Sequence, residues 1–104
     1  MYITIGKKDL KIVYANTFLK KLIGLSFKKN IYYGMLFKTC SIQTFFMRCN
    51  IDLCLLSKDY KIIKLVSNFK PGKILIDKNC YYILELPINC NKYLKVSEKL
   101  KIKG

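Results

Sequence analysis

A chain of 104 residues with 52% apolar and 13% aromatic side chains is the size of one folded domain and is too rich in core-forming residues to be disordered. The formal charge is +14, and the absence of histidine excludes Cys–His catalysis. The apolar runs are far shorter than the roughly 20 residues that a membrane-spanning helix needs, and the start lacks the pattern of a signal peptide. We therefore expect a single cytoplasmic domain over residues 1–104.

The first third of the chain combines two alternating segments with one helical segment. Residues 2–6 and 10–15 alternate apolar and polar side chains and are predicted to be the strands of a hairpin. After them the apolar period changes to that of a helix, with Asn16 or Thr17 as the N-cap and Gly24 at the end. This part of the chain predicts one short helix packed on a sheet.

The rest of the chain is a series of short apolar runs separated by turns. Residues 51–57 and 61–67 predict a second hairpin across a short polar turn. Residues 81–86 and 99–103 alternate as further strands, and Pro71-Gly72 marks a turn. The pattern predicts a mainly β fold, either a single small β-sandwich or a flattened barrel, with one or two short helices. Four large side chains are expected to fill its core: Met35, Phe45, Phe46 and Met47.

Five short motifs follow one another along the chain in an order that is found in a known family. They are Ala15-Asn16-Thr17 with Gly24-Leu25, Gly34-Met35-Leu36-Phe37, Phe46-Met47-Arg48, Ile51-Asp52-Leu53 and Leu84-Glu85-Leu86-Pro87. Together they resemble the family called domain of unknown function 192, over nearly the whole chain. The resemblance implies a compact, mainly β fold and supplies no established reaction.

Several positions depart from the motifs of that family. Cys49 stands where the family tends to have Asn, Asp52 where it has Pro, and Cys54 where it has Asp. Ser26 replaces the methionine of its G-L-M motif, and Phe46 replaces a tryptophan. If the family has a common site, the resemblance implies that this chain binds at it differently or not at all.

The cysteines are odd in number and irregular in spacing, and no two of them form a C-x-x-C pair. In a reducing compartment such residues behave as small, buried hydrophobic side chains. We therefore predict no metal site and no cofactor. The five cysteines are Cys40, Cys49, Cys54, Cys80 and Cys90.

The positive charge has two interpretations. All of the basic residues except Arg48 are lysines, and the chain is rich in residues with A- and T-rich codons, so a low-GC genome accounts for much of the excess. Arginine, which suits specific phosphate and base recognition, is nearly absent. A solvated lysine surface is the favoured interpretation. Non-specific association with nucleic acid or an anionic membrane surface is the alternative, in which tyrosines exposed beside lysines stack on bases, such as Tyr32, Tyr33, Tyr81 and Tyr82.

Two acidic residues lie inside apolar strand patterns, Asp52 and Glu85. A carboxylate in an apolar interior costs several kcal/mol unless it finds a cation or hydrogen-bond donors. Arg48 is the one guanidinium of the chain, so an Arg48–Glu85 ion pair is one hypothesis. Strand alternation favours another, an outward-facing Glu85 beside surface lysines.

These observations favour a non-enzymatic module that binds a ligand or a partner. The residues assigned to the binding site are Arg48, Asn50, Asp52 and Glu85. A hydrolase that uses Asp52 together with Glu85 is a less favoured alternative, because strands bring distant carboxylates together. No catalytic residue is assigned.

Overall fold

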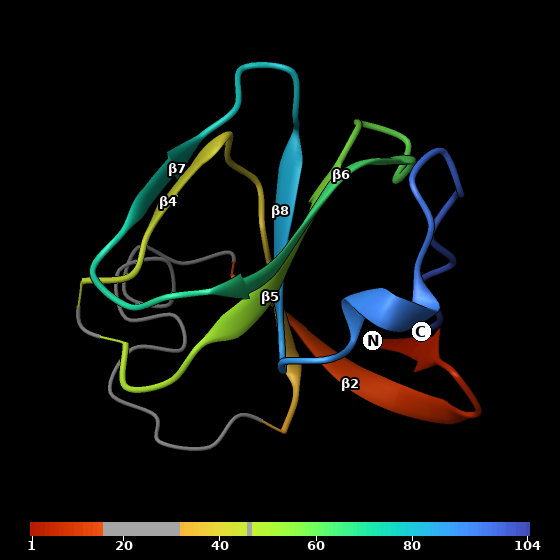
Figure 1. Ribbon diagram of the computed structural model, residues 1–104. Coiled ribbons are helices and arrows are strands. Elements are labelled where there is room, and N and C mark those ends of the chain that lie inside the picture. Colours follow the sequence, from red (N-terminus) through yellow and green to blue (C-terminus); the bar gives the residue numbers. More distant parts are fainter. Residues whose placement is uncertain (16–31, 46) are drawn as a thin grey trace.

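The computed structural model describes residues 1–15, 32–45 and 47–104, which fold mainly into β-strands (Figure 1). The elements are β1 (Tyr2–Ile5), β2 (Lys8–Tyr14), β3 (Gly34–Phe37), β4 (Ser41–Gln43), β5 (Ile51–Leu56), β6 (Ile62–Phe69), β7 (Ile74–Ile76), β8 (Tyr82–Leu86) and the 3₁₀ helix η1 (Asn91–Tyr93). One six-stranded sheet, in the order β1-β2-β3-β8-β5-β6, curls into a half-barrel, and β4 pairs with β7 in a separate ribbon. The predicted mainly β fold is confirmed.

Both predicted hairpins are present. β1 pairs antiparallel with β2 across a turn that contains Gly6 at φ 63°, a conformation that glycine adopts without steric cost. β5 pairs antiparallel with β6, and β8 inserts between β5 and β3. The helix predicted to begin at Asn16 or Thr17 lies outside the described residues. None of the described helices is long and apolar enough to cross a membrane.

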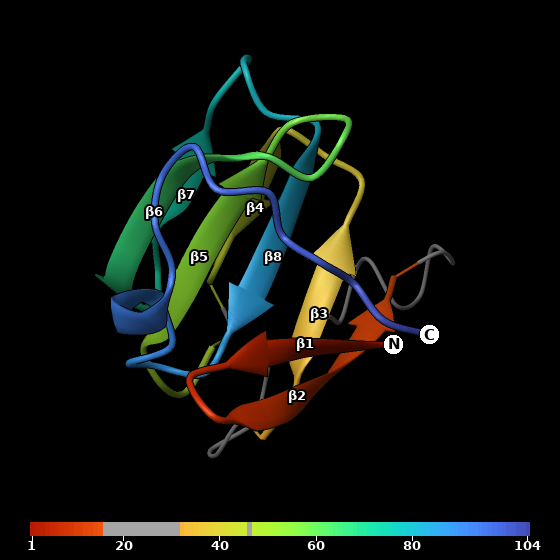
Figure 2. The same ribbon diagram turned by 90° about the vertical axis from the view of Figure 1, so that its right-hand side faces the viewer.

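Apolar side chains cover both faces of the six-stranded sheet. On the face that the C-terminal residues 94–103 cross (Figure 2), the strap-side core contains Ile3, Ile12, Leu36, Cys54, Leu56, Ile62, Leu84, Leu86, Cys90, Leu94 and Leu100. On the other face the ribbon-side core contains Ala15, Met35, Phe37, Met47, Ile51, Leu53, Leu55, Cys80 and Ile83. All six residues of β5 are buried because this strand lies between the two cores. Its sequence is therefore an almost continuous apolar run rather than an alternating one.

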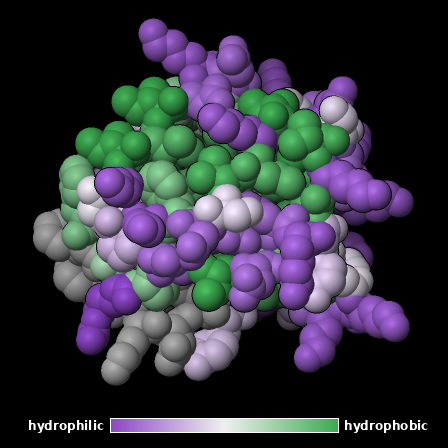
Figure 3. Space-filling model, in the orientation of Figure 1, coloured by the Kyte–Doolittle hydropathy of each residue, from purple (hydrophilic) through white to green (hydrophobic). Residues whose placement is uncertain are grey.

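The β4–β7 ribbon has an inner and an outer face. Ile42 and Leu75 pack against the ribbon-side core. Ile74 and Ile76 alternate with Leu75 and point outward, with 60% and 64% of their surfaces exposed. Figure 3 shows hydrophobic side chains gathered on the molecular surface in the region of this ribbon.

The side chains that were expected in the core differ in burial. Met35 and Met47 are buried, as predicted. The prediction is wrong for Phe45, whose side chain is 53% exposed. Its backbone N–H donates a 2.7 Å hydrogen bond to the side-chain oxygen of Gln43, and the resulting turn directs the phenyl ring outward. Phe46 lies outside the described residues.

The C-terminal residues 94–103, which we call the strap, cross the strap-side face of the sheet from one edge to the other (Figure 2). At the β6 edge Ile62 donates its backbone N–H to Glu98 at 2.8 Å, and at the β1 edge Tyr2 and Lys103 exchange two backbone bonds of 2.8 Å. The predicted continuous strand over residues 99–103 is therefore wrong. The segment forms isolated bridges instead, because its two ends pair with opposite edges of the sheet.

Candidate functional site

Asp52 is buried, with 2% of its surface exposed, at the end of the sheet where β5 begins. Its two carboxylate oxygens accept the backbone N–H groups of Asn68 and Asn91, each at 2.9 Å. Asn68 has φ 56°, and the pairing of β5 with β6 is irregular just beside Asp52. Asp52 therefore holds a bulge of the sheet and the start of η1 in place.

Asn50 joins the same polar cluster. Its side-chain amide donates a 2.8 Å hydrogen bond to the side-chain oxygen of Asn68. The buried amide of Asn91 donates to the backbone oxygen of Leu53 at 3.2 Å. Asn50 and Asp52, two of the four predicted site residues, are thus brought together through Asn68.

Arg48 and Glu85 do not meet. Arg48 is exposed in the bend that precedes β5, whereas Glu85 is 3% exposed on β8, paired with Met35 of β3 and Leu53 of β5. The one ion pair among the described residues joins Lys103 and Asp9, so the predicted Arg48–Glu85 pair is wrong. The outward-facing Glu85 is also wrong, because the ribbon-side core covers that face.

Asp52 and Glu85 point to opposite faces of the sheet. Residues directly opposite on antiparallel strands share a face, and Asp52 is opposite Leu86, a residue of the strap-side core. Glu85 is opposite Leu53, a residue of the ribbon-side core. The sheet therefore separates the two carboxylates, and they do not form the facing pair that the hydrolase alternative requires.

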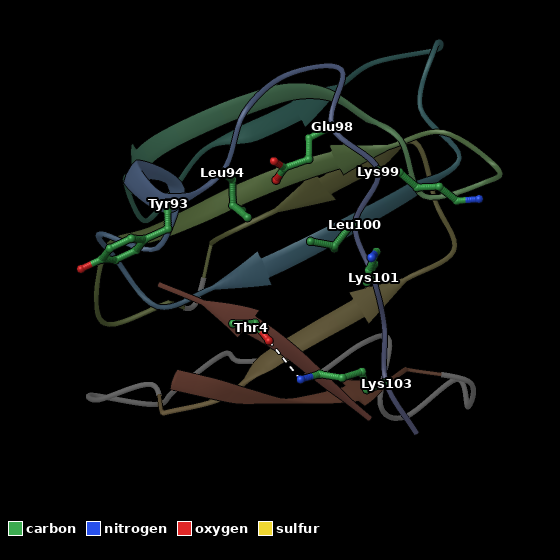
Figure 4. A pocket seen from close by; sticks show the side chains of 8 residues that line it. All are labelled: Thr4, Tyr93, Leu94, Glu98, Lys99, Leu100, Lys101 and Lys103. Carbon is green, nitrogen blue, oxygen red and sulfur yellow. Dashed lines mark hydrogen bonds between the residues drawn. The ribbon is translucent and has the colours of Figure 1, made fainter. Parts of the chain in front are cut away.

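A pocket of about 410 Å³ opens between β1, η1 and the strap (Figure 4). Its floor consists of Leu94 and Leu100, which are 7% and 6% exposed. The carboxylate of Glu98 points inward over this floor, whereas the ammonium group of Lys99 points away from it. We call this cavity the strap pocket. It is lined by Thr4, Tyr93, Leu94, Glu98, Lys99, Leu100, Lys101 and Lys103.

A hydrogen-bonded triad closes one side of the strap pocket. The Lys103 ammonium group donates to the Asp9 carboxylate at 2.9 Å and to the Thr4 hydroxyl oxygen at 3.0 Å. The Thr4 hydroxyl in turn donates to Asp9 at 2.9 Å. The bond from Lys103, and then that from Thr4, holds the pKa of Asp9 below its usual value. The triad ties the end of the strap to the β1–β2 hairpin.

Tyr93 forms the opposite wall, with 52% of its surface exposed. Its ring lies against Gly6, where an added Cβ atom would lie 3.0 Å from the ring carbon Cε1. The Lys92 ammonium group lies 5.1 Å from the ring centroid. The β1–β2 turn therefore sets the position of this ring. The strap pocket as a whole has an apolar floor, an aromatic wall and a few polar groups around one opening.

The cysteines contribute no recognisable site. None of the five cysteines, all of which lie in the described part of the chain, forms a disulfide, and Cys54, Cys80 and Cys90 are buried. Burial raises the pKa of Cys54 to about 12 and, with smaller contributions from neighbouring groups, those of Cys80 and Cys90 to about 11. The described residues hold no group of three or more cysteine and acidic side chains able to bind a metal ion. Neutral thiols of this kind are poor nucleophiles.

The sequence did not reveal the strap pocket. Its only local signal is the alternation of residues 99–103, which predicts a strand instead. The pocket depends on the approach of the strap to Thr4, more than 90 positions away along the chain, as the Lys103–Thr4 hydrogen bond shows. No motif spans such a separation.

Comparison with known proteins places the chain among uncharacterised relatives. The model of the DUF192 family, described as Uncharacterized ACR, matches residues 1–103. UPF0127 protein TK1120 of Thermococcus kodakarensis is 30% identical over 95 residues, which cover 85% of this chain and 60% of that protein. UPF0127 protein PH1112 of Pyrococcus horikoshii is 33% identical over 97 residues, which cover 86% of this chain and 83% of that protein. The chain therefore spans only part of the Thermococcus protein.

Two solved structures have the same fold. A protein of unknown function from Novosphingobium aromaticivorans has a TM-score of 0.79 at 16% identity, covering 97% of this chain and 82% of its own. A putative transcription regulator from Sinorhizobium meliloti has a TM-score of 0.78 at 21% identity, covering 99% of this chain and 90% of its own. At these identities the likeness shows the fold alone.

Proposed function

The chain belongs to the DUF192 family of uncharacterised proteins, and we propose that it is a non-enzymatic module that binds a small organic ligand in the strap pocket. The observation that carries the proposal is the make-up of this cavity. Its volume of about 410 Å³ falls in the range of small-molecule sites, which combine an apolar lining with a few placed polar groups. Leu94 and Leu100 supply the apolar floor.

The charges around the pocket indicate the kind of ligand. The lining holds three lysines and one carboxylate, that of Glu98, and the whole chain carries +14. Lys99 points away from the floor (Figure 4) and Lys103 is paired with Asp9, so Lys101 is the lining cation best placed to meet an anionic group. A ligand with a flat apolar body and one anionic group would place the body on Leu94, Leu100 and Tyr93. Its anionic group would then lie beside Lys101 at the rim.

A fluorescent probe of this chemistry tests the proposal. Anilinonaphthalene sulfonate has an aromatic body and one negative charge, and its emission rises when it enters an apolar site. We expect Lys101→Ala to weaken its binding and Glu98→Gln to strengthen it, each by about two- to fivefold, the scale of one exposed charge contact. Lys78→Ala, which removes an exposed lysine of the β7–β8 connection, is the matched control.

Opposite changes for the two pocket variants, with no change for the control, support the proposal. Equal losses for Lys101→Ala and Lys78→Ala contradict it, because they would show that the probe responds only to net charge. The binding role assigned to Arg48, Asn50, Asp52 and Glu85 stays a prediction.

A further inference from the structure

A second feature lies at the end of the sheet where β8 begins. Lys38 directly follows β3, Lys58 lies in the turn after β5, and Tyr81 directly precedes β8. Figures 1 and 2 show the ends of β3 and β5 and the start of β8 at the same end of the molecule. The ammonium groups of Lys38 and Lys58 lie 5.1 and 6.0 Å from the centroid of the Tyr81 ring. The topology thus gathers an aromatic ring and two cations from three distant segments.

Two more rings support Tyr81. Tyr82 meets it edge to face, with ring centroids 4.8 Å apart, and Tyr60 stacks on Tyr82 at 4.9 Å. Tyr60 adopts φ 66°, a left-handed conformation that bulky residues rarely take. Such conformations persist where the surroundings fix them, and they gather at functional sites. All three tyrosines are half-buried, so the outermost ring is held in a fixed orientation.

The charges of this region favour an anionic partner. The neighbouring Tyr81 phenol raises the pKa of Lys38, and Lys38 lowers the pKa of Tyr81, so the lysine stays charged beside the ring. The adjoining turn contributes one carboxylate, that of Asp59, which accepts a hydrogen bond from the Ser57 hydroxyl, so the two lysines outnumber it. Both of the lysines that flank Tyr81 are exposed and open to an incoming anion.

We propose that Tyr81, Lys38 and Lys58 form a binding site for single-stranded nucleic acid. A base stacks on the Tyr81 ring, and the flexible ammonium groups pass from the ring to the phosphates on either side. The strand must be single, because a base that stacks on a side chain is not stacked in a duplex. Recognition by lysine point charges and one ring makes the site tolerant of sequence. This site lies apart from the strap pocket, and η1 follows the opposite end of β8.

Fluorescence anisotropy tests this proposal. The probe is a labelled 12-nucleotide DNA of mixed sequence, which is used as a single strand and annealed to its complement, each at two salt concentrations. We expect Tyr81→Ala to weaken single-strand binding by about 5- to 150-fold, the range for one lost base stack. Tyr81→Phe keeps the ring and should bind within about twofold of the wild type. Tyr32→Ala is the control, since Tyr32 is 79% exposed and lies outside the cluster.

The lysines provide a second test that does not depend on a buried ring. Lys38→Ala should reduce the slope of log K against log salt by about 0.7. Lys92→Ala is its matched control, because Lys92 also lies 5.1 Å from a tyrosine ring, that of Tyr93. If thermal melting shows that Tyr81→Ala does not fold, the difference between Lys38→Ala and Lys92→Ala tests the proposed site instead.

Four results would overturn the proposal. One is equal binding by the wild type and a folded Tyr81→Ala variant, and another is equal affinity for the duplex and the single strand. The third is identical loss for Lys38→Ala and Lys92→Ala, which would reduce the effect to net charge. Binding to phosphatidylserine vesicles without binding to DNA would also overturn it, in favour of a membrane partner.

Discussion

Gly34, the first residue of β3, lies where three strands approach closely. A Cβ atom added here would lie 2.6 Å from Ile12 Cδ1 and 3.2 Å from the backbone oxygen of Glu85. Ile12 is in the strap-side core and has little room to move. We therefore expect Gly34→Ala to lower the free energy of unfolding by about 1–3 kcal/mol, the cost of overpacking, as measured by urea denaturation.

A double variant separates steric overlap from a loss of backbone freedom. Ile12→Val removes the Cδ1 atom that the new methyl group would meet. Combined with Gly34→Ala, it should recover part of the lost stability, giving a favourable coupling energy. Strict additivity of the two changes would show that the close contact is not the cause.

Asp52 is a buried carboxylate whose role in the structure is clear from its two backbone hydrogen bonds. Asp52→Ala leaves the N–H groups of Asn68 and Asn91 without their acceptor, so we expect a loss of about 3 kcal/mol in urea denaturation. Asp52→Asn keeps one acceptor oxygen and should lose less. If both variants are as stable as the wild type, the bulge and η1 do not depend on this carboxylate.

Thiol reactivity should follow burial. Cys40 is exposed, whereas Cys54 is fully buried and has a pKa raised to about 12. Because the thiolate is the reactive form, iodoacetamide at pH 8 should label Cys40 well before Cys54. Mass spectrometry of the native protein measures the order, and labelling in urea is the control in which the difference disappears. Early modification of Cys54 in the native state would contradict the buried position of β5.

At the scale of elements, the strap depends on its attachment to the β1–β2 hairpin through Lys103, Asp9 and Thr4. Folding lowers the pKa of Asp9 from its ordinary value of 3.8. This contact therefore stabilises the fold fully above pH 3.8, and the stabilisation is lost as the pH falls through the lowered pKa. We expect Lys103→Met to raise the pKa of Asp9, as measured by carbon-detected NMR titration. Lys101→Met is the control, and an unchanged Asp9 titration in Lys103→Met would contradict the tether.

Local elements could be predicted from the sequence where one face of a strand is buried. The β1–β2 hairpin has a clear alternating period and a polar turn, and the structure contains it. The β5–β6 hairpin is predicted instead from two apolar runs that flank a short polar turn, because β5 is buried on both faces and does not alternate. Glu85 shows where this reasoning fails, because alternation distinguishes two faces of β8 but does not say that a ribbon from elsewhere covers the second one. A strand that is buried on both sides has no outward face.

At the scale of the whole molecule, the sites depend on contacts between distant parts of the chain. Arg48 and Glu85 share apolar surroundings in the sequence, yet one lies in an exposed bend and the other under the ribbon-side core. The strap pocket combines segments that no motif connects, and so does the site formed by Tyr81, Lys38 and Lys58. The residues of each site come together only through the topology of the fold.

Ligand binding in the strap pocket is tested most directly by amide NMR spectra of the ¹⁵N-labelled protein, recorded during titration with anilinonaphthalene sulfonate. We expect the largest shifts at Thr4, Tyr93, Leu94 and Leu100, which line the pocket. Shifts confined to the exposed isoleucines of β7, or to Asn50 and its neighbours, would contradict binding in the strap pocket and place the ligand elsewhere.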